Sequence, residues 1–117
     1  MGEGDQWQSA LVGIKAIAQG IVDGSREPLR AANEIYWAAW LAGDGEGGAW
    51  DSDEEAAILV SDYGAAFVQM LYSLERNLND PFAREAWEEL IRGAAVACLE
   101  ERLAPGYRIE GNLPVLE

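Results

Sequence analysis

The stretch that decides the fold is residues 79–99, NDPFAREAWEELIRGAAVACL, which has the pattern of one capped helix. Asn79 and Asp80 are residue types that cap helices, and Pro81 is tolerated at the first helical position. The apolar side chains that follow recur at steps of three and four, the period of one helix face. We therefore predict a helix over about 81–103. Its predicted inward face comprises Phe82, Ala86, Trp87, Leu90, Ile91, Ala94, Ala95, Cys98 and Leu99.

The same period recurs three times upstream, and each repeat is bounded by residues that start or stop helices. We predict helices over about 5–23, 26–42 and 52–78. Ser25 is the predicted N-cap of the second helix, with Pro28 in its first turn. The predicted core-facing residues of the second and third helices include Leu29, Ile35, Tyr36, Trp40, Ile58, Phe67, Leu71, Tyr72, Leu74 and Leu78.

These helices predict one all-α domain over residues 1–117, a bundle of about four helices with an extended C-terminal tail. A chain of 117 residues suits a single domain, and a hydrophobic content of 50% argues against disorder. Short connections make consecutive helices antiparallel neighbours. The tail over 107–115 alternates loosely, which predicts either an extended edge or a segment that wraps the bundle.

The charge of the chain is strongly one-sided, with 21 acids, 8 bases and a formal net charge of -13. Such a surface repels phosphate backbones and anionic lipids and attracts basic proteins. The sequence therefore predicts a basic protein partner and no direct contact with nucleic acid or membrane. The chain opens without a basic and apolar leader, and Cys98 is its single cysteine. A free thiol suits a reducing compartment, so we expect a cytoplasmic protein.

The sequence contains no histidine, which removes the commonest general base and metal ligand. It also contains no phosphate-binding glycine motif and no Cys/His set for zinc. We therefore predict no catalytic, cofactor-binding or metal-binding residue. Cys98 lies in an apolar run and is predicted to be a small buried hydrophobe rather than a nucleophile.

One enzymatic alternative stays open, because carboxylate pairs on helices can bind Mg²⁺. Asp51-x-x-Glu54 and Glu85-x-x-Glu88 loosely mimic the spacing used by the all-α nucleotide pyrophosphohydrolases. The competing interpretation of the second pair is a solvated helix face, with ion pairs to neighbouring arginines.

The densest acidic region surrounds the glycine-rich stretch 43–48 and contains no base. Mobile loops on rigid scaffolds often bind partners, and an aromatic residue amid acids is a typical anchor. The plain alternative is a solvated loop that leads into a helix whose first turn favours acids. The predicted partner-binding residues are Asp44, Glu46, Trp50, Asp51, Asp53, Glu54 and Glu55.

A single acid, Asp62, interrupts the apolar stretch 56–66. If it points inward it needs a partner, because an unpaired buried charge is costly. Arg30 and Arg76 are the candidates, and an outward side chain is the alternative.

One segment carries a resemblance to known proteins: Ile21-Val22-Asp23-Gly24-Ser25-Arg26-Glu27-Pro28-Leu29-Arg30-Ala31-Ala32-Asn33-Glu34-Ile35-Tyr36-Trp37. It resembles a pattern in small helical bacterial proteins of uncharacterised families. There, one helix ends in Asp-Gly, and the next opens around a Pro and carries Ala-Ala and Ile-x-Trp. Proteins of this type are often encoded near toxin genes and regarded as immunity proteins. The resemblance covers under a fifth of the chain, implies a helical fold and an immunity function, and transfers no functional residue.

These observations favour an acidic interaction protein, most concretely an immunity-type inhibitor that occludes a basic toxin or nuclease. Carboxylates would steer and hold the lysines and arginines that otherwise contact phosphates. A protein that mimics DNA to block a DNA-binding enzyme needs the same acidic face. A Mg²⁺-dependent hydrolase and a structural or regulatory helical homodimer are the competing hypotheses.

Overall fold

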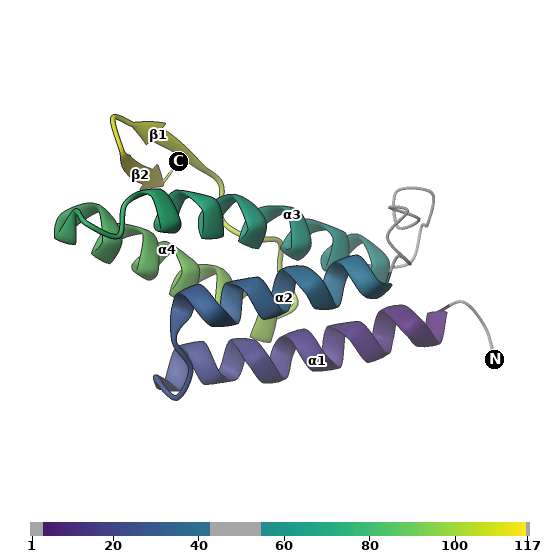
Figure 1. Ribbon diagram of the computed structural model, residues 1–117. Helices are drawn as coiled ribbons and strands as arrows, with labels where there is room; N and C mark the ends of the chain where they lie inside the picture. The colour runs from purple at the N-terminus through teal and green to yellow at the C-terminus, as the bar shows by residue number, and fades with distance from the viewer. Residues whose placement is uncertain (1–3, 43–54, 117) are drawn as a thin grey trace.

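The computed structural model describes residues 4–42 and 55–116, and their side chains from Trp7 onward. This part of the chain forms four helices followed by a small hairpin (Figure 1). The all-α bundle predicted from the sequence is confirmed, and the C-terminal tail adds two short strands. The elements are α1 (Gly4–Asp23), α2 (Pro28–Ala42), α3 (Glu55–Arg76), α4 (Pro81–Leu99), β1 (Tyr107–Glu110) and β2 (Leu113–Leu116).

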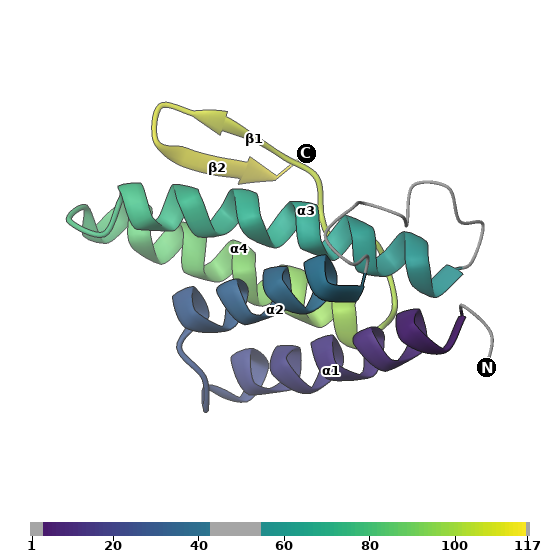
Figure 2. The same ribbon diagram turned by 45° about the vertical axis from the view of Figure 1, so that its right-hand side comes forward.

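The helices share one core, because each of them contributes buried apolar residues to the same cluster. α2 packs between α1 and α3, and α4 packs against α3 and returns to contact α1. Figure 2 shows the hairpin on the α3–α4 side of the bundle, away from α1, and β2 contacts α4. The largest fully buried side chains include Trp87, Tyr63 and Phe67.

Several residues predicted to face the core are exposed instead. Trp40 is 45% exposed, Tyr72 54% and Phe82 82%, and Ile58 and Leu78 are also exposed. The helical period identifies the apolar arc of a helix correctly, but it does not say how much of that arc the neighbours cover. In this bundle the apolar arcs of α2 and α3 are wider than their contacts, so apolar side chains remain on the surface.

The second helix begins at Pro28, so the prediction that Ser25 is its N-cap is wrong. The backbone N–H of Ser25 donates to Asp23 Oδ1 at 2.9 Å, and Gly24 adopts a φ of 82°. A carboxylate that accepts a backbone N–H two residues later makes a turn without any helix. Ser25 therefore belongs to the turn after α1. Hydrogen bonds from the side chain and then the backbone N–H of Ser25 lower the pKa of Asp23.

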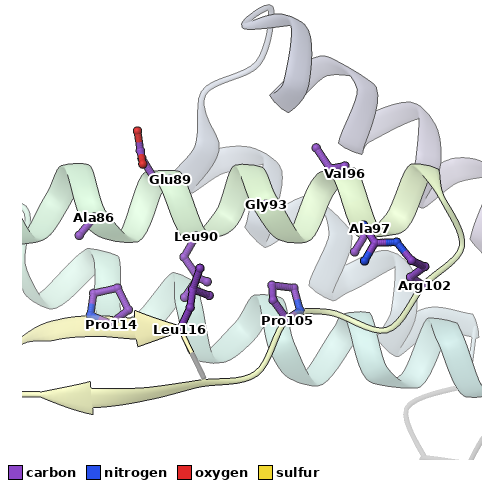
Figure 3. Close-up of a pocket in the computed structure, with 10 residues that line it drawn as sticks. All are labelled: Ala86, Glu89, Leu90, Gly93, Val96, Ala97, Arg102, Pro105, Pro114 and Leu116. Carbon is purple, nitrogen blue, oxygen red and sulfur yellow. The ribbon is translucent and has the colours of Figure 1, made fainter.

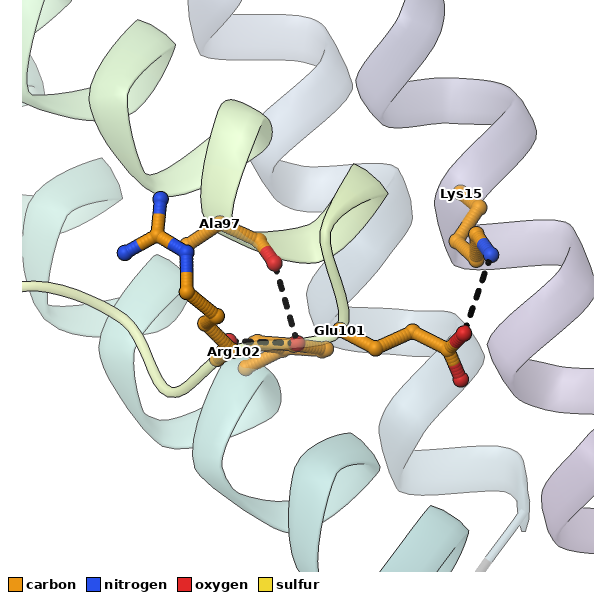
Figure 4. Close-up of polar contacts among 5 residues, drawn as sticks. Lys15, Ala97, Glu101 and Arg102 are labelled. Atoms are coloured by element: carbon orange, nitrogen blue, oxygen red, sulfur yellow. Dashed lines mark hydrogen bonds and ion pairs between the residues drawn. The ribbon is translucent and has the colours of Figure 1, made fainter.

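The fourth helix ends at Leu99, four residues before the predicted end. Its end is a Schellman motif, in which Arg102 N donates to Ala97 O at 2.8 Å and Glu101 N donates to Cys98 O at 3.1 Å. Glu101 occupies the left-handed position of this motif, with a φ of 55°. The side chain of Glu101 reaches Lys15 of α1, where Oε2 and Nζ are 3.5 Å apart (Figure 4).

Replacement of Glu101 with glycine is expected to raise the free energy of unfolding by about 1 kcal/mol, because a left-handed conformation costs an L-residue roughly 1–2 kcal/mol. The exposed ion pair with Lys15 offsets little of this gain. Urea denaturation measures the change. Glu101→Gln is the control, since it removes the charge and keeps the Cβ. If the free energy of unfolding of Glu101→Gly is equal to or lower than that of Glu101→Gln, the left-handed conformation of Glu101 is not strained.

The segment after α4 is held by two side chains of α3. Asp62 Oδ2 accepts the backbone N–H of Ala104 at 2.9 Å, and Tyr63 Oη donates to Arg102 O at 2.6 Å. Asp62 is half-buried, so neither the inward nor the fully outward prediction holds, and its partner is a backbone N–H rather than either candidate arginine, Arg30 or Arg76. Burial raises the pKa of Tyr63, which keeps its hydroxyl protonated as a donor.

The hairpin pairs Tyr107 with Leu116 and turns at Gly111-Asn112. Gly111 has a φ of 68°, as the first position of a tight hairpin turn requires. Asn112 fastens the turn to α4, because its carbonyl accepts Trp87 Nε1–H at 3.0 Å and its amide donates to Asp80 Oδ2 at 2.8 Å. The predicted cap at Asp80 is confirmed, since Oδ1 accepts the N–H groups of Phe82 and Ala83. These bonds lower the pKa of Asp80.

Among the described helices, α3 is the one whose length and mean hydropathy match those of a membrane span. Over half of that apolar window, 56%, is buried against the other helices. The central helix of a bundle has the same composition, because it needs apolar residues around most of its circumference.

Candidate protein-interaction surface

Most of the predicted partner-binding residues lie outside the described residues. These are Asp44, Glu46, Trp50, Asp51, Asp53 and Glu54. The seventh, Glu55, is the first residue of α3 and is exposed. The acidic stretch therefore stays a prediction, and Glu55 is its one member with a described position.

A row of aromatic side chains lies on the outer side of α2. The ring centroids of Tyr36 and Trp37 are 5.4 Å apart, and those of Tyr36 and Trp40 are 6.4 Å apart. Trp37 and Trp40 are each about half exposed, and Leu41 beside them is 68% exposed. Tyr36 is partly buried and contacts both Trp rings, which face solvent, so the three rings form a preorganised contact surface.

A second row of exposed side chains runs along α3. Ile58, Ala65 and Tyr72 follow one another at intervals of seven residues, which is two helical turns, so they lie in one line. All three are exposed, and Tyr72 is more than half exposed. The buried side chains of α3, such as Phe67 and Leu74, lie on the opposite side.

The two rows lie on the same side of the α2–α3 pair. The helices approach closely at Ala39 and Gly64, where a methyl group on Gly64 would lie 2.7 Å from Ala39 Cβ. The residues that follow these two, Trp40 in α2 and Ala65 in α3, are each rotated by about 100° around their helix axis from this contact. Since α2 and α3 run antiparallel (Figure 1), both turns lead to the same side. Trp40 and Ala65 are therefore neighbours across the pair. We call Tyr36, Trp37, Trp40, Ile58, Ala65 and Tyr72 the α2–α3 face.

The size of this face distinguishes it from scattered surface apolar residues. A half-exposed Trp or Tyr side chain leaves on the order of 100 Å² in contact with water. The α2–α3 face thus presents a few hundred Å² of apolar surface across two adjacent helices. Patches of that size on a folded domain are a mark of interaction sites.

Acids border the apolar face at both ends of α3. Glu55 lies one turn before Ile58, and Glu75 lies one turn after Tyr72. Both are exposed, and neither takes part in an ion pair among the described residues. An apolar centre with a charged rim is the usual anatomy of a protein–protein interface.

Most basic side chains of the chain are held by its own acids. Six of the 8 bases form ion pairs between described residues. Examples are Arg26 with Glu34 at 2.6 Å and Arg84 with Glu88 at 3.5 Å. These pairs offset much of the positive charge locally, while the surplus acids leave the surface negative toward a partner.

The described residues offer little to a metal-dependent reaction. Glu85 and Glu89 are exposed on α4, and Glu88 is paired with Arg84. Within residues 4–42 and 55–116 there is no group of three or more Asp, Glu or Cys residues that could hold a metal ion. Asp51 and Glu54, the other half of the predicted carboxylate set, lie outside those ranges.

The buried thiol of Cys98 agrees with the prediction of a small hydrophobe. Cys98 is fully buried, and burial raises the pKa of its thiol to about 12. The thiolate is the nucleophilic form of cysteine, so this side chain is unreactive in the folded protein.

Comparison with protein-family models, with curated proteins and with solved structures finds no match to this chain. The candidate surface therefore rests on its own geometry.

The sequence-based prediction missed the α2–α3 face because it placed Tyr36, Trp40, Ile58 and Tyr72 toward the core. One signal was present in the sequence. Positions 36, 37 and 40 of a helix span about 100°, and with Ile35 and Ala39 inward they reach well beyond a core-facing stripe. Three aromatic residues across such an arc indicate either a wholly buried helix or a binding face.

Proposed function

We propose that this chain is a protein-interaction module that binds a basic protein through the α2–α3 face. Its most concrete form is an immunity-type inhibitor that occludes the working surface of a basic toxin or nuclease. The observation that carries the proposal is the aromatic face itself, with Trp37 48% exposed and Trp40 45% exposed. The net charge of -13 supports a basic partner.

The chemistry of the face suits lysine and arginine. Trp and Tyr rings attract cations over their π-faces, and the attraction grows as water is excluded. Rim acids such as Glu55 and Glu75 would steer the partner during approach, while the rings would hold it after docking. Occlusion needs no catalytic group, which agrees with the absence of histidine from the sequence.

The test is binding and inhibition with the basic protein that the chain recovers from its source cells. Trp37→Ala and Trp40→Ala are expected to raise the dissociation rate at least tenfold, since buried aromatic anchors dominate binding energy. Glu55→Gln/Glu75→Gln is expected to lower the association rate and its dependence on salt. Surface plasmon resonance gives both rates, and a nuclease assay reports the loss of inhibition.

Phe82→Ala is the matched control, because it removes an aromatic ring that is 82% exposed on α4. Its rates should equal those of the wild type. If the two Trp variants behave like Phe82→Ala, the docking surface lies elsewhere. A wild-type protein that is a dimer in light scattering, and that Trp40→Ala converts to a monomer, would assign the face to a second copy and overturn the proposal.

A further inference from the structure

A groove lies between α4 and the hairpin (Figure 3). The hairpin itself lies on the α3–α4 side of the bundle, away from α1 (Figure 1). Its volume is about 560 Å³, within the range of small-molecule sites. α4 forms one wall, and the chain that follows it forms the other. The lining is apolar apart from Glu89 and Arg102, and it includes Leu90, Gly93, Ala97, Pro105, Pro114 and Leu116.

Gly93 is the residue of this groove that the fold does not explain. A helix is less stable with glycine than with alanine at an interior position, so a glycine there often has a structural reason. Gly64 is needed because any side chain would collide with Ala39, and Gly24 and Gly111 are needed for a positive φ. A Cβ on Gly93 would meet no atom within 4 Å. The missing side chain leaves open space beside α4 at this point of the groove.

The polar residues of the groove indicate what kind of polar group a ligand would place there. Arg102 stands at one end beside Ala97, whereas Glu89 points away from the hairpin wall (Figure 3). Arg102 Nη2 donates to Glu100 Oε1 at 2.6 Å, which uses one of the five N–H donors of the guanidinium. The Arg102 side chain is 60% exposed, so its remaining donors are accessible to a ligand, and carboxylate is the strongest partner for a guanidinium.

We propose that this groove binds an elongated apolar molecule with one carboxylate end, such as a medium-chain fatty acid. Ala86 and Ala97 line opposite ends of the groove, eleven residues apart on α4, which gives a length of about 16 Å. Leu90, Pro105, Pro114 and Leu116 contact the apolar body, and Arg102 binds the carboxylate. The net charge of -13 repels anions at long range, but this repulsion is screened within about 8 Å at physiological salt.

The test uses calorimetry with decanoate as the probe and decanol as its neutral counterpart. Wild-type protein should bind decanoate saturably at sub-millimolar concentration and decanol at least tenfold more weakly. Gly93→Leu fills the groove and should abolish binding of both. Arg102→Gln should reduce the affinity for decanoate at least fivefold and leave that for decanol unchanged.

Gly13→Leu is the matched control, because Gly13 is also helical, exposed and without an atom within 4 Å of an added Cβ. It should bind decanoate like the wild type, and circular dichroism should show both leucine variants fully helical. Absence of saturable binding overturns the site. Equal loss in Gly13→Leu and Gly93→Leu also overturns it. Equal affinities for decanoate and decanol, unchanged in Arg102→Gln, overturn the assignment of a carboxylate ligand. None of these results depends on a protein partner.

Discussion

Replacement of Trp87 with alanine is expected to lower the free energy of unfolding by about 3–5 kcal/mol, as for other buried tryptophans. Trp87 is 1% exposed and, among the described residues, is the largest fully buried side chain. It also joins the helices to the hairpin. Its Nε1–H donates to the carbonyl of Asn112, and its ring meets that of Tyr107 edge-on with centroids 5.4 Å apart. The alanine variant loses the packing, the hydrogen bond and the ring contact together.

Two further variants separate these contributions in urea denaturation. Trp87→Phe keeps a ring in the core and removes the donor, so it should cost less than the alanine variant. Trp40→Ala makes the same chemical change on the α2–α3 face and should alter stability by less than about 1 kcal/mol, because Trp40 is already half in water. Equal losses in Trp87→Ala and Trp40→Ala would contradict both the buried position of Trp87 and the exposed position of Trp40.

The substitution Gly64→Ala is expected to destabilise the bundle by about 2 kcal/mol, as overpacking of a well-packed core usually does. In an isolated helix the same change stabilises the helix by about 1 kcal/mol. The sign of the change in the free energy of unfolding therefore shows whether the contact with Ala39 exists. The added methyl would lie 2.7 Å from Ala39 Cβ, and neither atom can move without its backbone. α2 and α3 would have to separate.

The double variant Ala39→Gly/Gly64→Ala tests this explanation by moving the methyl group from one helix to the other. It should recover most of the lost stability, although a glycine in place of Ala39 weakens α2. Gly93→Ala is the control for helix propensity and should gain stability, since its Cβ meets no neighbour. A stabilising Gly64→Ala would show that α2 and α3 do not approach as described, and the α2–α3 face would lose its geometric basis.

The helices themselves were predictable from the period of their apolar residues, and the start of α4 also from its capping residues. Asp80 followed by Pro81 is recognisable as a helix start from the sequence alone, and Asp80 is the N-cap in the structure. The end of α4 was not predictable from the sequence, because Glu101 occupies a left-handed position that usually carries glycine. The residues that follow it are held by tertiary hydrogen bonds, from Ala104 to Asp62 and from Tyr63 to Arg102, which involve another helix. Such contacts have no signature in the local sequence.

The candidate surface was predictable only in part, for a related reason. The period of apolar residues predicts that Trp40 and Tyr72 belong to apolar arcs, but coverage of an arc depends on the neighbouring helices. Asp62 shows the same limit, because its partner proved to be the backbone N–H of Ala104 rather than an arginine. The acidic stretch 44–54 lies outside the described residues, and Glu55 alone connects that prediction to the α2–α3 face.

The contact between α4 and α1 affects how the protein folds during synthesis. Lys15 and Glu101, which pair across these two helices, are 86 residues apart in the chain. During synthesis the first helix emerges long before its last neighbour, and until then part of its apolar face is open to solvent. Closing so long a loop costs entropy that only the completed core repays. We therefore expect the bundle to form in one cooperative step after synthesis reaches α4, with the nascent chain most open to chaperones before that point.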